Sequence, residues 1–423
     1  MSGMNVFSRG IWKRRLSKPV RQRGAARALP TLVSLLTWGA LACGQNGSAV
    51  PDGGSGGNAA SGQGGVGGGD GGVGGPGGVG GDAGAAAAGT GGATGAGGDA
   101  GDGGTGVDPT TTLKYGAAQS GRLIGVALGA SRLSEADYAR TAATHFNYAT
   151  PENEMKWDAT EPSRNTFTFD RGDAVVAFAT DAGMKVKGHT LVWDSQLPPW
   201  VAAITDTTEL REVMINHITQ VVSHYRGKVD AWDVVNEAWT ESGHALRITV
   251  FSQYLGAGFI DEAFNAAHAA DPDARLYYND YGADGLGLKS DAIYNMVKGM
   301  LARGIPIHGV GLQMHTAAAE VPSAVDIAAN MQRLGALGID VAITELDVQL
   351  CTGDLDAQSR RFHDIVAVCV AESTCKTVTV WGVTDKYSWR NGQTCAIPRP
   401  LLFDDAYVPK PAHAGVLDAL LGR

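Results

Sequence analysis

Short apolar runs alternate with longer amphipathic stretches along the chain after residue 108. Runs rich in Val, Ile, Leu and Tyr are typical of buried strands. We expect strands at residues 123–128, 145–150, 185–190, 229–235, 274–278, 308–312, 340–344 and 377–382. Between them apolar residues recur at helical spacing, most clearly over 209–225, 251–270 and 290–303. This spacing predicts helices that cover the strands with one apolar face.

Eight strands with crossover helices predict a closed barrel of parallel strands. A doubly wound open sheet is the alternative, but no G-x-G-x-x-G fingerprint follows an early strand. We therefore expect an α/β protein with a single (β/α)8 TIM barrel over residues 109–423, preceded by a signal peptide and a disordered Gly-rich linker.

Composition separates the barrel from what precedes it. Gly accounts for 60 of the 423 residues, and residues 44–108 hold about half of them, without any aromatic residue, Lys or Arg. Such a segment cannot bury a core, so we interpret it as a disordered Gly/Ala-rich linker.

The first 43 residues have the layout of a signal peptide. Many Lys and Arg residues precede an apolar run over 32–42 that is too short to span a bilayer comfortably. The run ends at Ala42 and Cys43, which resemble a bacterial lipoprotein processing site with a lipidated Cys43. Because Ala40 stands where that motif usually carries Leu, ordinary cleavage near Ala42 remains the alternative. We expect a secreted or cell-surface bacterial protein, an outer-membrane lipoprotein if Cys43 is lipidated, with no other contact to a membrane.

The formal net charge of −9 limits the choice of partners. Because the predicted leader is strongly basic, the mature chain is more acidic still. We therefore expect no nucleic acid as a partner, because it carries the same sign of charge. A neutral polymer is compatible with this charge.

Two carboxylates end predicted strands. Glu237 follows the fourth apolar run and Glu345 ends the seventh. Reactive groups in a (β/α)8 barrel lie at the C-terminal ends of strands, so these two can face each other. A pair of carboxyl groups about 5–5.5 Å apart cleaves the acetal between two sugars with retention of configuration. The anion of one raises the pKa of the other, which then serves as the acid.

Seven motifs resemble those of glycoside hydrolase family 10, the xylanases. Asn236-Glu237 is similar to the acid/base motif, and Thr344-Glu345-Leu346-Asp347 is similar to the nucleophile motif. The others are TPENEMKW at 150–157, GHTLVW at 188–193, YNDY at 278–281, QMH at 313–315, and WGVTD at 381–385 with SWR at 388–390. Asp194 and Gly282 depart from the pattern, since the family usually has His and Asn there.

The resemblance implies a role for each matching residue. Glu237 is the expected acid/base and Glu345 the nucleophile. Asn236 is expected to bind the 2-hydroxyl of the sugar being cleaved, and His315 to hydrogen-bond Glu345 with Asp347 behind it. The substrate-binding residues implied are Glu152, Asn153, Lys156, His189, Trp193, Gln196, Tyr281, Gln313, Trp381 and Trp389.

By the same resemblance the chain is a retaining endo-1,4-β-xylanase. We expect xylan or xylo-oligosaccharide as substrate, no cofactor, no metal, and a monomer. The alternatives are a related hydrolase of β-1,4-glucan or aryl glycosides on the same barrel, and a non-catalytic protein that binds wall polysaccharide. The intact carboxylates, with His315 and Asp347, argue against the second alternative.

Four cysteines follow Cys43, at positions 351, 369, 375 and 395, and the expected secretion favours disulfides. Their spacing leaves three pairings open. Zinc binding is disfavoured because there is no C-x-x-C knuckle. The resemblance implies Cys369 with Cys375, as in fungal members, which leaves Cys351 with Cys395.

Overall fold

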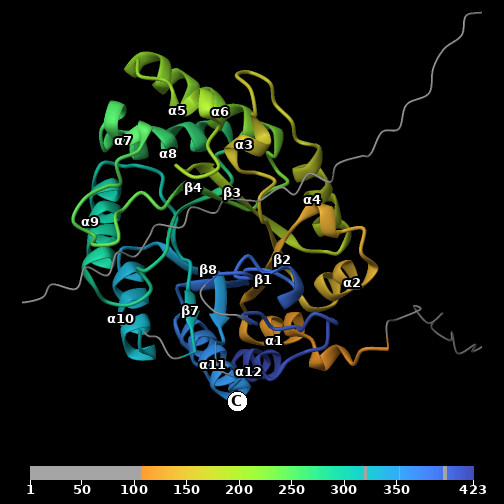
Figure 1. Ribbon diagram of the computed structural model, residues 1–423. Coiled ribbons are helices and arrows are strands. Elements are labelled where there is room, and N and C mark those ends of the chain that lie inside the picture. Colours follow the sequence, from red (N-terminus) through yellow and green to blue (C-terminus); the bar gives the residue numbers. More distant parts are fainter. Residues whose placement is uncertain (1–105, 319–321, 352, 394–397) are drawn as a thin grey trace, which may run out of the picture. The chain divides into compact units, whose positions relative to one another are not determined.

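Parallel strands close into a barrel in the computed structural model of the chain, which describes residues 106–318, 322–351, 353–393 and 398–423 (Figure 1). The predicted leader, Cys43 and the linker up to residue 105 lie outside the described residues. The barrel strands are β1 (Leu123–Leu128), β2 (Tyr148–Pro151), β3 (Lys185–Val192), β4 (Ala231–Asn236), β5 (Arg275–Asp280), β6 (Gly309–Leu312), β8 (Asp340–Gln349) and β9 (Cys375–Val380).

The ring closes because β9 pairs with β1 and β6 pairs with β8, all in parallel. The predicted (β/α)8 barrel is therefore confirmed. The short strand β7 (His315–Ala317) stands outside the ring and pairs with the second half of β8. The barrel strands are almost continuously buried, as expected for parallel strands that are covered on both faces.

Helices surround the barrel (Figure 1). They are α1 (Leu113–Ser120), α2 (Ala136–His145), α3 (Trp157–Thr160), α4 (Asp170–Asp181), α5 (Pro199–Ala202), α6 (Thr207–His224), α7 (Val250–Leu255), α8 (Gly258–Ala270), α9 (Leu288–Ala302), α10 (Ala324–Gly335), α11 (Leu355–Ala371) and α12 (Pro411–Leu420), with 3-10 turns η1 (Pro109–Thr111), η2 (Ala130–Arg132) and η3 (Asp385–Tyr387). The single helix expected over 251–270 is wrong, because Gly256 adopts a φ of 66° and ends α7 before α8 begins.

A glycine of β3 leaves room for a large side chain of the neighbouring strand β4. Trp232 of β4 is fully buried. A Cβ on Gly188 of β3 would lie 2.2 Å from its ring. Only glycine lets the indole approach this strand so closely.

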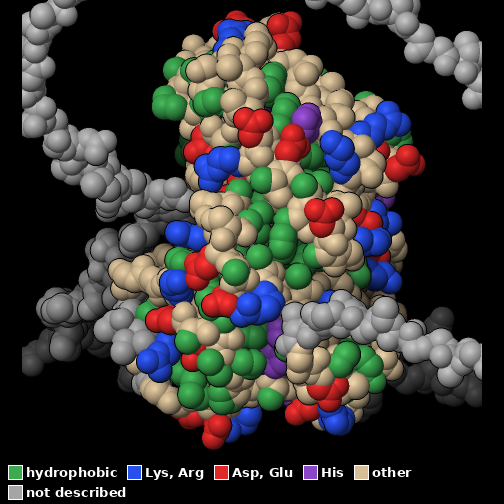
Figure 2. Space-filling view, turned by 90° about the vertical axis from the view of Figure 1, so that its right-hand side faces the viewer, with side chains coloured by type: hydrophobic (Ala, Val, Ile, Leu, Met, Phe, Trp, Pro, Cys, Tyr) green, Lys and Arg blue, Asp and Glu red, His purple; other side chains and the backbone are tan. Residues whose placement is uncertain are grey.

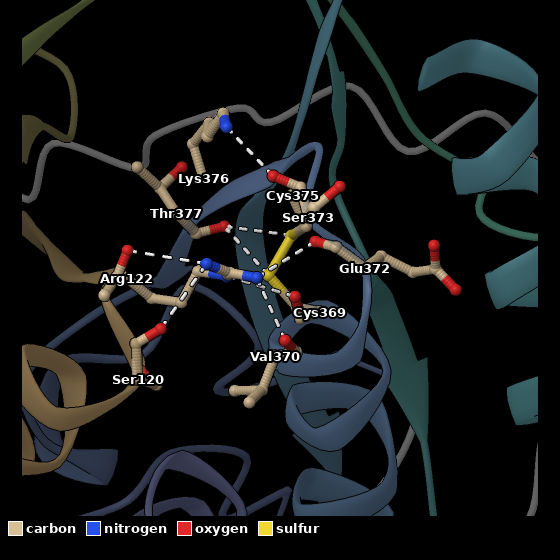
Figure 3. The surroundings of a disulfide bond; sticks show 10 residues. Ser120, Arg122, Cys369, Val370, Glu372, Ser373, Cys375, Lys376 and Thr377 are labelled. Atoms are coloured by element: carbon tan, nitrogen blue, oxygen red, sulfur yellow. Dashed lines mark hydrogen bonds between the residues drawn. A yellow bond between two sulfur atoms is a disulfide. The ribbon is translucent and has the colours of Figure 1, made fainter. Parts of the chain in front are cut away.

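A disulfide joins Cys369, near the end of α11, to Cys375 at the start of β9 (Figure 3). This is the pair that the resemblance implies. Beside it, Arg122 donates to the carbonyls of Cys369, Val370 and Glu372 over 2.9–3.2 Å. A cation that satisfies the last carbonyls of a helix stabilises its C-terminus. Cys351 is also disulfide-bonded, and its predicted partner, Cys395, lies outside the described residues.

Acidic and basic side chains are interspersed on the face shown in Figure 2. That face therefore offers a polyanion no continuous basic stripe. Within the described part of the chain, the helices are all too short or too polar to cross a membrane.

Candidate active site

The C-terminal ends of β4, β5, β6 and β8 meet around the two predicted catalytic carboxylates. Glu237 directly follows β4, and Glu345 lies within β8. Backbone bonds connect their strands: the N–H of Glu237 donates to the carbonyl of Asn279 over 2.9 Å, and that of Glu345 to the carbonyl of Gln313 over 3.0 Å. The β8–β9 register shifts between Ile343 and Leu346, an irregularity of the kind that re-aims side chains beside active sites.

Three residues around these carboxylates have a positive φ although none is glycine. They are Gln196 (48°), Glu237 (55°) and Met314 (63°). Each such conformation costs about 1–3 kcal/mol and persists only where surrounding contacts impose it. The fold therefore holds these side chains in directions that a relaxed backbone would not give them.

Glu237 is half-buried and hydrogen-bonded through both carboxyl oxygens. Trp193 donates from Nε1 to Oε2 over 3.1 Å, and Gln313 donates from Nε2 to Oε1 over 2.9 Å. Burial raises the pKa of Glu237 to about 7, with the anions of Asp280 and Glu345 adding to the shift and the bond from Gln313 opposing it. Glu237 thus holds its proton to near neutral pH.

Glu345 lies in the opposite electrostatic setting. Burial alone would raise its pKa, but the hydrogen bond from His315 and the positive potential of His189 and His315 outweigh burial and lower it. Asn279 also donates, from Nδ2 to Oε1 over 2.7 Å. Glu345 is therefore held as an anion.

His315 bridges Glu345 and Asp347. Its Nε2 lies 3.1 Å from Oε2 of Glu345, and its Nδ1 lies 2.9 Å from Oδ2 of Asp347. Burial opposes protonation, but the charge of Asp347 and the hydrogen bonds to both carboxylates raise the pKa of His315 to about 9. The ring is an imidazolium at neutral pH and donates to both anions.

Asp347 is fully buried and accepts from two residues of the loop after β9. Trp389 donates from Nε1 to Oδ2 over 2.8 Å, and Arg390 donates to Oδ1 from Nε over 3.1 Å and from Nη2 over 2.8 Å. We did not predict Arg390 from the sequence as a site residue. Its place in the Ser388-Trp389-Arg390 motif was the available signal.

Asn279 links Glu345 to Asn236, and its role was also missed. Its Nδ2 donates to Oδ1 of Asn236 over 2.9 Å as well as to Glu345. Gln313 donates from Nε2 to the same Asn236 oxygen over 3.3 Å and to Glu237. Asn236, Asn279 and Gln313 therefore form one buried amide network between the two carboxylates.

Lys156 lies with two of the residues predicted to bind sugar. Its Nζ donates to Oδ1 of Asn153 over 2.9 Å and to Oε1 of Gln196 over 2.7 Å, and lies 5.0 Å from the centre of the Trp193 ring. Glu152 precedes this group, and burial raises its pKa to about 7, against the charge of Lys156.

His189 and Trp381 extend this side of the site. Nδ1 of His189 lies 3.1 Å from Oδ2 of Asp233. The edge of its ring meets Trp381 with the ring centres 5.3 Å apart. Trp381 is buried, and its ring also lies edge-on to His315, at 6.4 Å. These contacts bring the Trp381 indole beside the network that holds Glu345.

Tyr281 lies in a charged cluster on the loop after β5. Its hydroxyl donates to Glu241 and accepts from Arg247, and Nζ of Lys289 lies 3.9 Å from its ring centre. Arg247 also lines a small hollow with Glu237. Of the two departures from the family pattern, Asp194 is exposed, and Gly282 has a φ of 63°, a conformation that Asn also tolerates.

The arrangement pairs a carboxyl group that keeps its proton near pH 7 with a carboxylate that stays ionised. Such a pair supplies an acid for the leaving oxygen of a glycoside and an anion for its anomeric carbon. Among the described residues, no three His, Cys, Asp or Glu side chains group together as a metal site.

Comparison with known proteins agrees with this chemistry. The model of the family described as glycosyl hydrolase family 10 matches residues 112–419. An endo-1,4-beta-xylanase of Agaricus bisporus is 39% identical over 74% of this chain and 95% of its own length. The crystal structure of xylanase 10B from Thermotoga maritima is 38% identical, with a TM-score of 0.71, and the alignment covers 73% of this chain and 98% of that one. Xylanase 10B from Thermotoga petrophila RKU-1, solved in complex with xylobiose, is 37% identical, with a TM-score of 0.71 over 73% of this chain and 97% of that one.

Proposed function

The chain belongs to glycosyl hydrolase family 10 and is an endo-1,4-β-xylanase, and we propose that it cleaves xylan with retention of configuration. Glu237 acts as the acid/base and Glu345 as the nucleophile. The opposite protonation of the two carboxyl groups carries this proposal: the pKa of Glu237 is raised to about 7, and that of Glu345 is lowered.

In the first step, a carboxylate oxygen of Glu345 attacks the anomeric carbon. The bond from this carbon to the leaving oxygen breaks, and Glu237 gives its proton to that oxygen. The product is a glycosyl ester on Glu345, and the released chain carries the new hydroxyl group. Because His315 and Asn279 already donate to the attacking carboxylate, little reorganisation is needed during the step.

In the second step, Glu237 reverses its role. The ester on Glu345 is neutral, so the charge of Glu345 no longer adds to the effect of burial on the pKa of Glu237. Glu237 then takes a proton from a water molecule, whose oxygen attacks the anomeric carbon and releases Glu345. Two inversions at one carbon give net retention.

The substrate contacts follow from the groups around the carboxylates. Asn236, held by Asn279 and Gln313, presents its amide to the sugar being cleaved. Lys156, Asn153 and Gln196 are already bonded to one another and can exchange those bonds for sugar hydroxyls; Glu152, His189 and Trp193 complete this side. Trp381 and Trp389 provide aromatic faces that suit the apolar faces of pyranose rings.

Residues 1–43 are proposed to export the protein, with Cys43 as the site of lipidation. The basic start, the short apolar run and the Ala42-Cys43 end support this proposal. Radioactive palmitate should label the parent and not a Cys43→Ala variant. Label in both the parent and the Cys43→Ala variant, or in neither protein, would contradict lipidation at this residue.

Removing each carboxylate in turn tests the roles. With an activated aryl xylobioside, Glu237→Ala should still form the glycosyl ester, and added azide should give the β-azide. Glu345→Ala cannot form the ester, so azide should attack directly and give the α-azide. If the two variants gave the opposite azides, the assignment of the two roles would be reversed. Asp137→Asn, which changes a carboxylate on the outer helix α2, is the control and should behave like the parent.

Substrate choice is tested with linear β-1,4-xylan and amorphous β-1,4-glucan. Short xylo-oligosaccharides should appear early, with little sugar released from glucan. Activity on glucan alone would contradict the substrate and spare the two-carboxylate mechanism. Folded protein that is silent on both polymers would favour the binding-protein alternative.

A further inference from the structure

One residue separates the two side chains that hold the catalytic carboxylates. Gln313 donates to Glu237 over 2.9 Å, and His315 lies 3.1 Å from Glu345. Met314 lies between them, after β6 ends at Leu312 and directly before β7 begins at His315. Its φ of 63° determines the directions in which Gln313 and His315 leave the backbone.

The conformation of Met314 needs an external support. A positive φ in a residue other than glycine costs about 1–3 kcal/mol and is kept only where contacts impose it. The Met314 side chain is fully buried, and its N–H donates to Oδ1 of Asp284 over 3.1 Å. Asp284 thus holds the strained residue at its backbone.

Asp284 is itself anchored to the outer layer of the barrel. The fully buried Asn330 of α10 donates from Nδ2 to the carbonyl of Ala283 over 2.8 Å and to that of Asp284 over 3.3 Å. Arg333 fixes the orientation of this amide by donating to its Oδ1 over 2.9 Å. The loop after β5 therefore connects a helix to the Met314 turn.

We propose that Asp284 is a positioning residue that sets the distance and direction of both catalytic carboxylates through the Met314 turn. The proposal rests on the roles proposed above for Glu237 and Glu345. Asp284 acts by accepting one hydrogen bond, so its geometry matters more than its charge. The charged groups that influence it are His315 on β7, Lys289 on α9, Asp280 on β5 and Arg361 on α11.

The test compares Asp284→Ala with Asp284→Asn in the full chain. The Ala variant should lose about 10- to 100-fold in kcat on xylan with little change in KM, since misplaced reacting groups cost about that much. Its alkaline pH limb should move, because Gln313 would no longer hold Glu237 in place. The Asn variant keeps an accepting oxygen and should stay within about 3-fold of the parent.

Asn147→Ala is the matched control. The Asn147 side chain accepts from the N–H of Ile124 over 2.8 Å at the other end of the barrel. This variant should lower the melting temperature and leave kcat and the pH profile unchanged. Asp284→Ala with the same pattern as this control would overturn the proposal, as would an Asn variant as slow as the Ala variant. A Glu237→Ala or Glu345→Ala variant with parental activity on xylan would refute the proposed function instead.

Discussion

Asn279 donates a hydrogen bond of 2.7 Å from its amide nitrogen to Oε1 of Glu345. The amide cannot rotate away from this position, because its own oxygen accepts from Thr344 over 2.7 Å and the residue is fully buried. The side chain therefore orients the proposed nucleophile and, through Asn236, the contact expected at the sugar 2-hydroxyl.

Gly311 leaves the space that Asn279 occupies. A Cβ at this position would lie 2.2 Å from Oδ1 of Asn279 and 2.8 Å from Cγ2 of Thr344. Gly311→Ala should therefore displace the amide and lower kcat/KM on xylan by about 10- to 100-fold. Steady-state rates on xylan, with circular dichroism to confirm folding, measure this effect.

Gly258→Ala is the control for Gly311→Ala. An added Cβ there meets nothing within 4 Å, so activity should equal that of the parent. Parental activity in a folded Gly311→Ala variant would show that the position of Asn279 does not limit the rate.

Much of this site could be predicted from the chain because strand ends are visible in the sequence. Glu237 and Glu345 each end an apolar run, and the parallel topology brings such ends to one edge of the barrel. The motifs also contain His315, which lies within hydrogen-bond distance of Glu345, and Asp347, which lies within hydrogen-bond distance of His315.

The supporting residues could not be predicted, because their roles depend on contacts between distant segments. Asp284 acts through the N–H of Met314, and Arg390 acts through Asp347. Neither the turn at Met314 nor the loop after β9 has a periodic pattern. The break at Gly256 was missed for a related reason, since apolar spacing continues from α7 into α8 and conceals one left-handed residue.

The pH profile of kcat/KM should reflect the two carboxyl groups. Glu237 must be protonated, so activity should fall as pH rises through about 7, the pKa to which burial raises it. Glu345 must be ionised, so the acidic limb should lie below the ordinary value of 4.5, because its pKa is lowered. Initial rates from about pH 3 to pH 9 measure both limbs.

Glu152→Gln is the control for the alkaline limb, because burial raises the pKa of Glu152 to about 7 as well. A limb that persists in this variant does not arise from Glu152, as expected if Glu237 is the group that titrates. Its disappearance would assign the limb to Glu152 and contradict the prediction.

His315 should make stability depend on pH in the neutral to alkaline range. Its pKa rises from an ordinary 6.5 to about 9 in the folded protein, so the folded state binds the proton more tightly. This stabilisation is complete below about pH 6.5 and is lost as pH rises through about 9. Urea unfolding at intervals across this window should show a decline in the parent that is weaker in His315→Gln. Equal slopes in the two proteins would mean that the ring gains no proton on folding.

Arg390 should affect substrate binding and the ionisation of Glu345 through separate contacts. It donates twice to Oδ1 of Asp347, and its guanidinium lies 4.9 Å from the centre of the Trp389 ring. Arg390→Met removes both contacts. Without the guanidinium beside it, the Trp389 ring is less well held, so KM should rise about 3- to 10-fold. The buried carboxylate of Asp347 also loses a partner, which typically costs about 3–5 kcal/mol of stability. Loss of this cation also raises the pKa of Asp347. Once Asp347 takes up a proton in acid, His315 loses the anion that favours its imidazolium, so the acidic limb should move to higher pH.

Arg390→Lys separates the two effects, because a lysine keeps the charge but lacks the planar guanidinium that places two N–H groups on Oδ1 of Asp347. Its acidic limb should stay near that of the parent while its KM remains raised. The matched control is Arg303→Met. At the solvent-exposed surface, Arg303 at the end of α9 donates two hydrogen bonds to Asp261 of α8, at 2.7 and 2.9 Å. That variant should keep both KM and the pH limbs. If Arg390→Lys instead moved the acidic limb as far as Arg390→Met, the geometry of the two bonds and not the charge of Arg390 would govern the ionisation of Glu345.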